Sequence, residues 1–522
     1  MSEPRKKKFG CLALIFIGLG ALLAIPLLWL AFNFRPIASE GKPFADVSPE
    51  TTWITEPLDE NGDVDYLEAL NLRQSKGITP ENNAAVLYTR VFGPCSFDEQ
   101  LFTQYLAKLG IDGSQVYDNP FVEFDDWLEK RNRELQIEIS SDANSPDNAS
   151  EQYDYLTDGD AKPWSSEQFP AVAEWMEENS EVAKTIRDAT KRQRCYFPMV
   201  ANAKPKVLSA LLPYPQKLRN AARYFSLTAL QHLHDNDIEK FIDDLQCMEQ
   251  MAQHIAQGPT LVEELVSTAI KNMVLSRIIA ACDLELEADD LKALMTFTKT
   301  IKPLDDLASR IDIGERFMML DATVSAGRGE SEMDNSFSLA FIDWNETLRV
   351  LNAERDLLVE KLNAEDHASR LQGSREMWNR LEQMDRDKSI EFVTSVVMGR
   401  KSNGRRVGKL LTTLLTPAFA QLLAAELRLK SKIEMAQIAI AISIYRKEKG
   451  DLPDTIQQLV PEYLEVIPVE DATGEPYEMS KTDTGAGFRV HSAAWIEGVQ
   501  KPELEIMIAP ATYSFETFLQ EN

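Results

Sequence analysis

The sequence has few cysteines, five in 522 residues. One of them, Cys11, lies in an apolar run near the start of the chain. The others form no Cys-x-x-Cys pair, and their positions are Cys95, Cys195, Cys247 and Cys282. This usage excludes a disulfide framework and leaves room for one disulfide, with buried free thiols as the simpler interpretation.

Basic residues are also scarce relative to acidic ones. The chain has 55 lysines and arginines against 83 aspartates and glutamates, which gives a net charge of −28. Such a surface repels phosphate backbones, so we expect no nucleic-acid partner. With 44% apolar and 26% charged residues, and only 23 glycines and 25 prolines, the composition excludes a wholly disordered chain, a fibrous protein and a polytopic membrane protein.

Sequence signatures of catalysis are missing as well. The chain has no His-Glu-x-x-His motif, no Gly-x-Ser-x-Gly motif and no glycine-rich phosphate loop. Its histidines are His232, His234, His254, His367 and His491. The first two are two residues apart, about 200° around a helix, so they do not face one ligand together. We therefore expect no metal and no cofactor.

The amino terminus predicts a membrane anchor. A basic cluster at residues 5–8 precedes 24 residues without a charge, residues 9–32. As a helix this run extends about 36 Å, enough to cross a hydrocarbon core of about 30 Å. We expect a cytoplasmic tail over residues 1–8 and a transmembrane anchor over residues 9–33. By the positive-inside rule, residues 36–522 then lie outside the cytoplasm, in the periplasm.

The alternative is a cleaved signal peptide. Its apolar region spans roughly 7–15 residues and ends in a small-x-small site. The run in this chain is longer, and the best downstream site, near Ala38, matches poorly. An uncleaved anchor is therefore the better interpretation, and the membrane is the first expected partner.

Composition divides the remainder of the chain into four parts. Residues 34–60 are rich in proline, serine, threonine and acidic residues, which predicts a linker. Residues 61–170 predict a mixed region of short helices, with an exposed acidic loop within 123–160, where 12 acidic residues occur against three basic ones. Residues 171–430 predict a helical domain, and residues 431–522 predict a separate C-terminal module.

The helical domain shows the most regular pattern. Apolar residues recur every three or four positions over 218–233, 238–255 and 261–273. Short polar turns join these segments, so we expect antiparallel helices. The first two resemble a tetratricopeptide-type hairpin, with small residues at the helix crossing and an acidic turn. No 34-residue repeat extends the pattern.

Helical patterns continue to residue 449, with looser segments at 327–337 and 399–406. The second of these lies within a basic island before the apolar run 410–425. Its members are Arg400, Lys401, Arg405, Arg406 and Lys409. One interpretation is an amphipathic element on anionic headgroups. The other, which we favour, is a solvated loop before a buried helix.

A further pattern occupies residues 434–491. A helix ending in tyrosine is followed by Gly-x-x-Pro, a short helix, an Asp-x-x-Gly-x-Pro-Tyr turn and a returning strand. Its positions are Tyr445, Gly450, Pro453, Leu459, Tyr463, Leu464, Pro468, Asp471, Gly474, Pro476, Tyr477, Phe488, Arg489 and Val490. The pattern resembles the carboxy-terminal part of the major pseudopilins of type II secretion, which implies a small α+β module with a β-hairpin. The early glutamate that drives pseudopilin assembly has no counterpart here, so the resemblance implies no pilus.

Three segments carry a wider resemblance. They are Gly-Pro-Thr-Leu at 258–261, Gly-Glu-Arg-Phe at 314–317 and the segment 445–477. The arrangement is similar to a group of large, membrane-anchored bacterial proteins with a basic-start anchor, a helical centre and this terminal module. The resemblance implies the architecture and no activity.

The candidate site residues are polar groups in the helical domain. Glu315, Arg316 and Asp321 lie beside an apolar run, and His254 lies on the second helix of the hairpin. Adjacent residues of a helix project to different faces, which separates Glu315 from Arg316. A glutamate or arginine beside a core is a catalytic acid, a ligand clamp or a member of a salt bridge, and we favour the salt bridge.

The sequence thus predicts a mainly α protein with an N-terminal transmembrane helix, antiparallel helical hairpins and a small α+β module at the C-terminus. We expect an envelope scaffold or protein-binding module with protein partners outside the cytoplasm. The alternatives are a membrane-tethered hydrolase, with a carboxylate and histidine site in the helical domain, and an accessory component of a secretion apparatus.

Overall fold

The computed structural model describes residues 41–116, 120–135, 149–159, 161–303, 307–330, 341–364, most of 369–380, 399–470, 474–481, 488–492 and 504–508. Over these residues the protein is mainly helical, as the sequence predicts. The expected tail and anchor, residues 1–8 and 9–33, lie outside the described residues, and so does His367.

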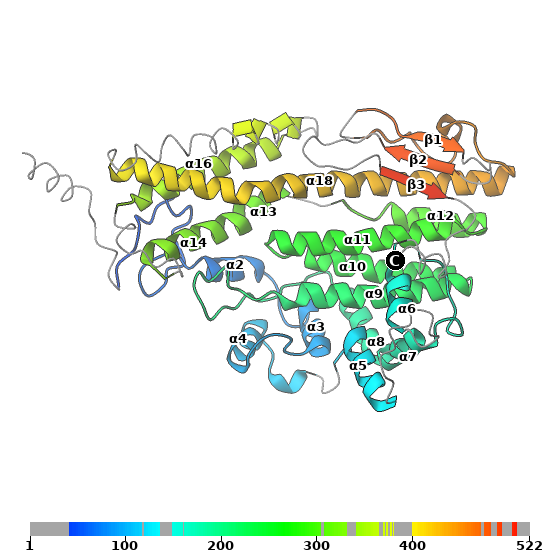
Figure 1. Ribbon diagram of the computed structural model, residues 1–522, viewed down its shortest axis with the longest axis horizontal. Helices are drawn as coiled ribbons and strands as arrows, with labels where there is room; N and C mark the ends of the chain where they lie inside the picture. The colour runs from blue at the N-terminus through cyan, green and yellow to red at the C-terminus, as the bar shows by residue number, and fades with distance from the viewer. Residues whose placement is uncertain are drawn as a thin grey trace, which may run out of the picture.

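Helices of different length form successive layers (Figure 1). The first part of the chain contains α2 (Tyr66–Gln74), α3 (Ala84–Phe92), α4 (Glu99–Leu109), η1 (Gly113–Gln115), α5 (Phe124–Leu135), α6 (Ala149–Thr157), α7 (Pro170–Glu178) and α8 (Ser180–Thr190). The middle layer contains α9 (Pro213–His234), α10 (Ile238–Ile255) and α11 (Leu261–Cys282), followed by α12 (Ala288–Thr298). The remaining helices are α13 (Leu307–Arg310), η2 (Ile311–Glu315), α14 (Arg316–Arg328), α16 (Trp344–Leu362), α18 (Arg400–Lys449) and η3 (Ile456–Leu459).

The central helices α9, α10 and α11 pack against one another and are joined by short turns. Asp237 caps α10 by accepting a hydrogen bond from the backbone N–H of Lys240. Thr260 caps α11 in a reciprocal capping box with Glu263. A helix lies at each of the three predicted positions, and the likeness to a tetratricopeptide hairpin stays a prediction.

Among the described residues, α11 is the one helix whose length and apolar composition would suit a membrane crossing. Within its most apolar window, 61% of the residues are buried inside the protein. The neighbours that cover it are α9, α10 and α18. A buried core helix meets the same criterion, so α11 is weak evidence for a membrane span.

The long helix α18 runs without interruption for 50 residues and ends at Gly450, which has a left-handed backbone. The sequence predicts a looser segment at 399–406 and a boundary between residues 430 and 431. In the structure residues 400–406 form the first turns of α18, and the boundary falls inside the same helix.

Two glycines near the start of α18 pack closely against the N-terminal half of α16. A Cβ atom on Gly404 would lie 2.3 Å from the carbonyl oxygen of Asp343, and one on Gly408 would lie 2.8 Å from the Cβ atom of Val350. These glycines therefore allow the two helices to approach closely. The basic island consequently lies on a helix, where Arg405 forms an ion pair with Glu346 at 2.6 Å.

Residues 41–60, predicted as part of a linker, pack against the helical body. The ring of Phe44 lies 5.5 Å from the ring of Trp344 between centroids. A Cβ atom on Gly327 would overlap the Phe44 ring, so α14 also approaches this segment closely. The composition of the segment is that of a linker, but its aromatic side chains join a hydrophobic cluster with α2 and α14.

Three short strands lie beside the second half of α18 (Figure 1). They are β1 (Glu478–Lys481), β2 (Phe488–Ser492) and β3 (Leu504–Ile508), antiparallel in the order β1-β2-β3. The hydroxyl of Tyr477 donates to Glu434 at 2.7 Å, and that of Tyr463 donates to Glu448 at 3.0 Å. These tyrosines attach the C-terminal segment to α18, and its likeness to pseudopilins stays a prediction.

Candidate functional site

Two segments that stand out in the sequence meet in the structure. They are the Gly-Pro-Thr-Leu turn between α10 and α11, and the Gly-Glu pair at the end of η2. A Cβ atom on Gly314 would lie 1.9 Å from the carbonyl oxygen of Pro259, so only glycine fits at this approach. The backbone N–H of Leu261 donates to Glu315 Oε1 at 3.2 Å. Glu315 of the second segment therefore caps the N-terminus of α11, the helix that follows the Gly-Pro-Thr-Leu turn.

The turn itself is fixed by side chains that satisfy the two helix ends. Arg310 donates to the carbonyl oxygens of Ala256 and Gly258, which follow the end of α10. The N–H and hydroxyl of Thr260 both donate to Glu263 Oε2 at 2.9 Å. The polar groups of the turn are thus bonded within the protein.

The local helix geometry also differs from a regular α-helix. Residues Ile311–Glu315 form a turn of π-helix between α13 and α14. Such turns are rare and occur frequently at functional sites. Here the π-turn brings Gly314 against the Gly-Pro-Thr-Leu turn.

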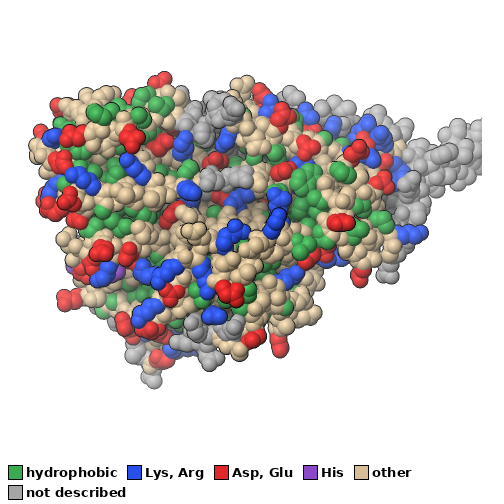
Figure 2. All heavy atoms as spheres, turned by 180° about the vertical axis from the view of Figure 1, so that it is seen from behind, with side chains coloured by type: hydrophobic (Ala, Val, Ile, Leu, Met, Phe, Trp, Pro, Cys, Tyr) green, Lys and Arg blue, Asp and Glu red, His purple; other side chains and the backbone are tan. Residues whose placement is uncertain are grey.

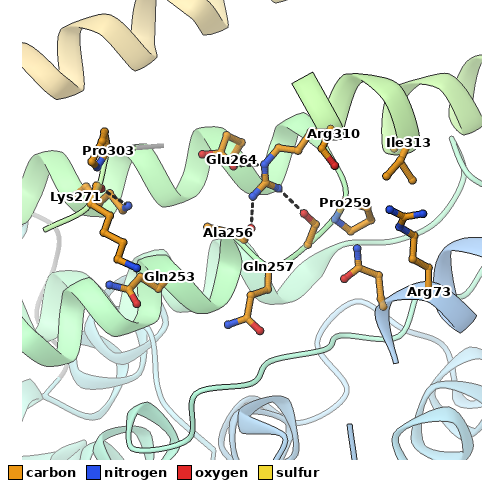
Figure 3. A pocket seen from close by; sticks show the side chains of 15 residues that line it. Arg73, Gln253, Ala256, Gln257, Pro259, Glu264, Lys271, Pro303, Arg310 and Ile313 are labelled. Atoms are coloured by element: carbon orange, nitrogen blue, oxygen red, sulfur yellow. Dashed lines mark hydrogen bonds and ion pairs between the residues drawn. The ribbon is translucent and has the colours of Figure 1, made fainter. Parts of the chain in front are cut away.

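A cavity of about 420 Å³ lies beside this meeting point. Its walls come from α2, the end of α10, the turn at residues 256–259, the first half of α11, residues 302 and 303, the end of α13, and η2. Figure 3 places Lys271 and Arg73 at opposite ends of the cavity, with Arg310 between them. Viewed from behind, Figure 2 shows a group of lysine and arginine side chains near the middle of that face.

The charged side chains of the lining are mostly basic, in a strongly acidic protein. Four of its side chains are cationic and one is a carboxylate, and these are Arg73, Lys271, Lys302, Arg310 and Glu264. Three glutamines add amide groups, namely Gln74, Gln253 and Gln257. Cations and amides are donors for negatively charged or oxygen-rich ligands.

Two of the cations are already bound by acceptors of the protein. Arg310 forms an ion pair with Glu264 at 2.5 Å in addition to its two carbonyl contacts. The buried ammonium of Lys271 donates to the carbonyl oxygen of Lys302 at 2.7 Å and lies 3.7 Å from Glu249. Burial raises the pKa of Glu249, and Lys271 opposes this shift. These contacts hold the walls of the cavity in place.

The other two cations are exposed. Within the described residues, neither the guanidinium of Arg73 nor the ammonium of Lys302 has an assigned hydrogen bond or ion pair. Arg73 lies in the last turn of α2, whereas Lys302 follows α12. Their charges are therefore available to a ligand.

The predicted site residues Glu315 and Arg316 are buried, and they take different directions. Glu315 faces the start of α11, and burial raises its pKa. Arg316 forms ion pairs with Asp312 at 2.5 Å and Asp356 at 2.7 Å. Its guanidinium also lies over the Trp53 ring, 5.1 Å from the centroid. Neither side chain lines the cavity.

His254, on α10, is also buried. Its Nε2 donates to the carbonyl oxygen of Arg192 at 2.6 Å, and its Nδ1 is 2.9 Å from the hydroxyl of Tyr88. Because a carbonyl only accepts, Nδ1 accepts from Tyr88 in the neutral ring. Burial lowers the pKa of His254 to about 4. The structure thus does not bring His254 together with Glu315 and Arg316.

Two other residues that the sequence analysis names, Asp321 and His232, are bonded to groups of the protein itself. Asp321 accepts from the backbone N–H of Val207 at 2.8 Å, and burial raises its pKa to about 6. His232 bonds to the buried Asp244 at 2.8 Å. In the part of the chain that the structure describes, the cysteines are free and no group of three or more His, Cys, Asp or Glu side chains is placed to hold a metal ion.

Comparisons with protein-family models, with curated proteins and with solved structures gave no match for this chain.

Sequence reasoning missed all four cations of the cavity. One signal was present for Lys271, which is the single lysine in the apolar run of α11. A lysine at such a position needs a partner, and Glu249 on α10 supplies it. For Arg73 and Lys302 the sequence contains no comparable signal, because both are exposed cations and the protein has many of these.

Proposed function

We propose that this protein is a single-pass, membrane-anchored protein whose helical body lies outside the cytoplasm and acts as a binding module. The anchor over residues 9–33 and its orientation rest on the uncharged run and the basic cluster before it. The binding role rests on one observation, the cavity of about 420 Å³ between α2, α10, α11 and η2. This volume is in the range of small-ligand sites, about 300–1,000 Å³.

The frame of the cavity supports binding because it is fixed before a ligand arrives. Arg310 ties the end of α10 to η2, and Glu315 ties η2 to the start of α11. Gly314 also packs directly against the carbonyl group of Pro259, with no room for a side chain between the two segments. A preorganised site loses less entropy on binding than a flexible one.

A hydrolase is the second candidate, and one group in the turn favours it. Burial raises the pKa of Glu263 to about 7, the range of a general acid or base at neutral pH. However, the Glu263 carboxylate accepts two hydrogen bonds from Thr260 in the capping box, and it does not line the cavity. The cationic and amide donors that line the cavity suit the binding of a ligand, so a binding role is better supported than hydrolysis.

The C-terminal sheet and the α9–α10 hairpin are the surfaces proposed for protein partners in the envelope. The first rests on the pseudopilin resemblance and the second on the tetratricopeptide resemblance. A role in a secretion apparatus rests on the first of these by analogy alone.

Site-specific photo-crosslinking in intact cells tests the proposed function. A photo-reactive amino acid replaces Gln74, which lines the cavity, and in a matched variant it replaces Val466, which is 68% exposed and outside the lining. We expect an adduct with a defined mass from position 74 and none of that mass from position 466. Identical products from both positions, or none from either, would contradict a binding role for the cavity.

The topology is tested separately. A reporter enzyme that is active only outside the cytoplasm is fused after Asn522, and a reporter that is active only inside serves as its counterpart. We expect activity from the first fusion. Activity of the second fusion alone, at equal expression, would reverse the proposed orientation.

A further inference from the structure

We infer that the cavity takes a small anion that carries two acidic groups, carboxylate or phosphate, one at each end. This inference rests on the proposed binding role and names the ligand class of the same site. The carrying observation is the arrangement of charge in the cavity. Its free cations, Arg73 and Lys302, both line the cavity, and Figure 3 places Arg73 at the end opposite to Lys271.

The two ends are identified by their neighbours. Lys302 supplies the carbonyl oxygen to which Lys271 donates at 2.7 Å, so Lys302 belongs to the Lys271 end. Figure 3 places Arg73 at the opposite end, beside Ile313. A ligand with a single charge would satisfy one end and leave the other cation without a partner. A ligand with two acidic groups satisfies both.

The middle of the cavity is neutralised by the protein itself. Arg310 lies there, and Glu264 and two backbone carbonyls occupy its donors. At the Lys271 end, the amide of Gln253 bonds to Glu249 at 3.1 Å, as Figure 3 places Gln253 beside Lys271. The middle therefore suits the uncharged part of a ligand, with its hydroxyl or carbonyl groups, and the ends suit its charges.

The charge of the whole chain limits the size of the ligand. The protein carries a net charge of −28, so a long polyanion would lie over acidic surface beyond the cavity. Charges are screened over about 8 Å at physiological ionic strength, and a small anion inside the cavity is therefore attracted mainly by the local cations. The guanidinium of Arg73 adds a planar fork that matches carboxylate or phosphate geometry.

Isothermal titration of the purified full-length protein in a neutral detergent tests the inference. The probes are glutarate and adipate for paired carboxylates, pyrophosphate for phosphate, acetate as a single charge, and glutaramide as an uncharged analogue. We expect binding of at least one dianion, with acetate at least about tenfold weaker and glutaramide without measurable binding. The carboxylate and phosphate arms show which acidic group the site prefers.

Two pairs of variants connect binding to the cavity. Arg73→Ala and Lys302→Ala remove the free cations, and their matched controls are Lys76→Ala and Lys299→Ala, which remove exposed lysines nearby that do not line the cavity. We expect each cavity variant to weaken dianion binding by about tenfold and each control to leave it within about twofold. All four positions are exposed, so thermal unfolding should show the same folded protein.

Each result decides between the ligand class and the binding role. Dianion binding that is insensitive to Arg73→Ala and Lys302→Ala would overturn the inference, and so would stronger binding of glutaramide than of glutarate. If no dianion binds while crosslinking at position 74 yields its adduct, the ligand class is wrong and the binding role stands. If both experiments are negative, both proposals fail.

Discussion

The variant Gly314→Ala tests the packing on which the cavity depends. Its new methyl group would lie 1.9 Å from the carbonyl oxygen of Pro259 and 2.8 Å from the carbonyl carbon. Real Cβ contacts essentially never fall below 3.0 Å, so η2 and the turn must separate by at least about 1 Å. This separation would stretch the hydrogen bond from Leu261 to Glu315, which measures 3.2 Å.

Two opposing effects set the magnitude. Alanine favours a helix over glycine by about 1 kcal/mol, which would stabilise the variant. Forcing a methyl group into a packed site costs about 1–3 kcal/mol, and weakening a buried hydrogen bond adds about 1 kcal/mol. The opposing atoms are backbone, which cannot rotate away as a side chain can. We therefore expect a net loss of about 1–3 kcal/mol in the free energy of unfolding.

The assay is urea unfolding of the full-length protein in detergent, followed by tryptophan fluorescence. The control is Gly113→Ala, because a Cβ atom at Gly113 meets nothing within 4 Å. We expect the control to unfold within about 0.5 kcal/mol of the parent protein, as surface substitutions usually do. A Gly314→Ala variant as stable as the control would refute the close approach of η2 to the turn.

Three further predictions concern buried titratable side chains. Lys271→Met leaves the carboxylate of Glu249 buried without its cation, so we expect the free energy of unfolding in urea to fall by about 3–5 kcal/mol. The double variant with Glu249→Leu should recover most of this loss, and no recovery would contradict the pairing. Burial raises the pKa of Glu263 from 4.5 to about 7, so its contribution to stability is full below pH 4.5 and is lost as pH rises through 7. The variant Glu263→Gln should therefore flatten the fall in the free energy of unfolding between pH 4.5 and 7. An unchanged slope would exclude Glu263 as the source of that fall. Because burial lowers the pKa of His254 to about 4, its NMR signals should show a neutral ring at pH 6 and titrate near pH 4, whereas a midpoint near 6.5 would show that the ring is exposed.

Local information was sufficient for the central helices. The apolar period and the capping residues Asp237 and Thr260 are both visible in the sequence, and both act within a few residues of themselves. The segment 399–406, predicted to be looser, is helical from Arg400 onward instead. Only the presence of α16 shows that Gly404, and Gly408 after it, serve close packing.

The candidate site depends on contacts that no local pattern contains. The turn at 258–261 and the segment 314–317 each stood out in the sequence, but their contact with each other was not predicted. The bond from Leu261 to Glu315 joins residues 54 positions apart. Glu315 and Arg316 did project to different sides, as their adjacency on a helix requires. The cavity nevertheless uses Arg310 and Gly314, which come just before them.

The helix α18 has a consequence for how the body unfolds. Its side chains enter two hydrophobic clusters, with Ile433 and Ile440 in the larger one and Leu422 and Leu427 in the smaller one. Neither cluster can melt without breaking part of one continuous backbone hydrogen-bond ladder. Amide protons near Leu427 and Ile433 should accordingly exchange with deuterium at similar slow rates, as parts of a single cooperative unit.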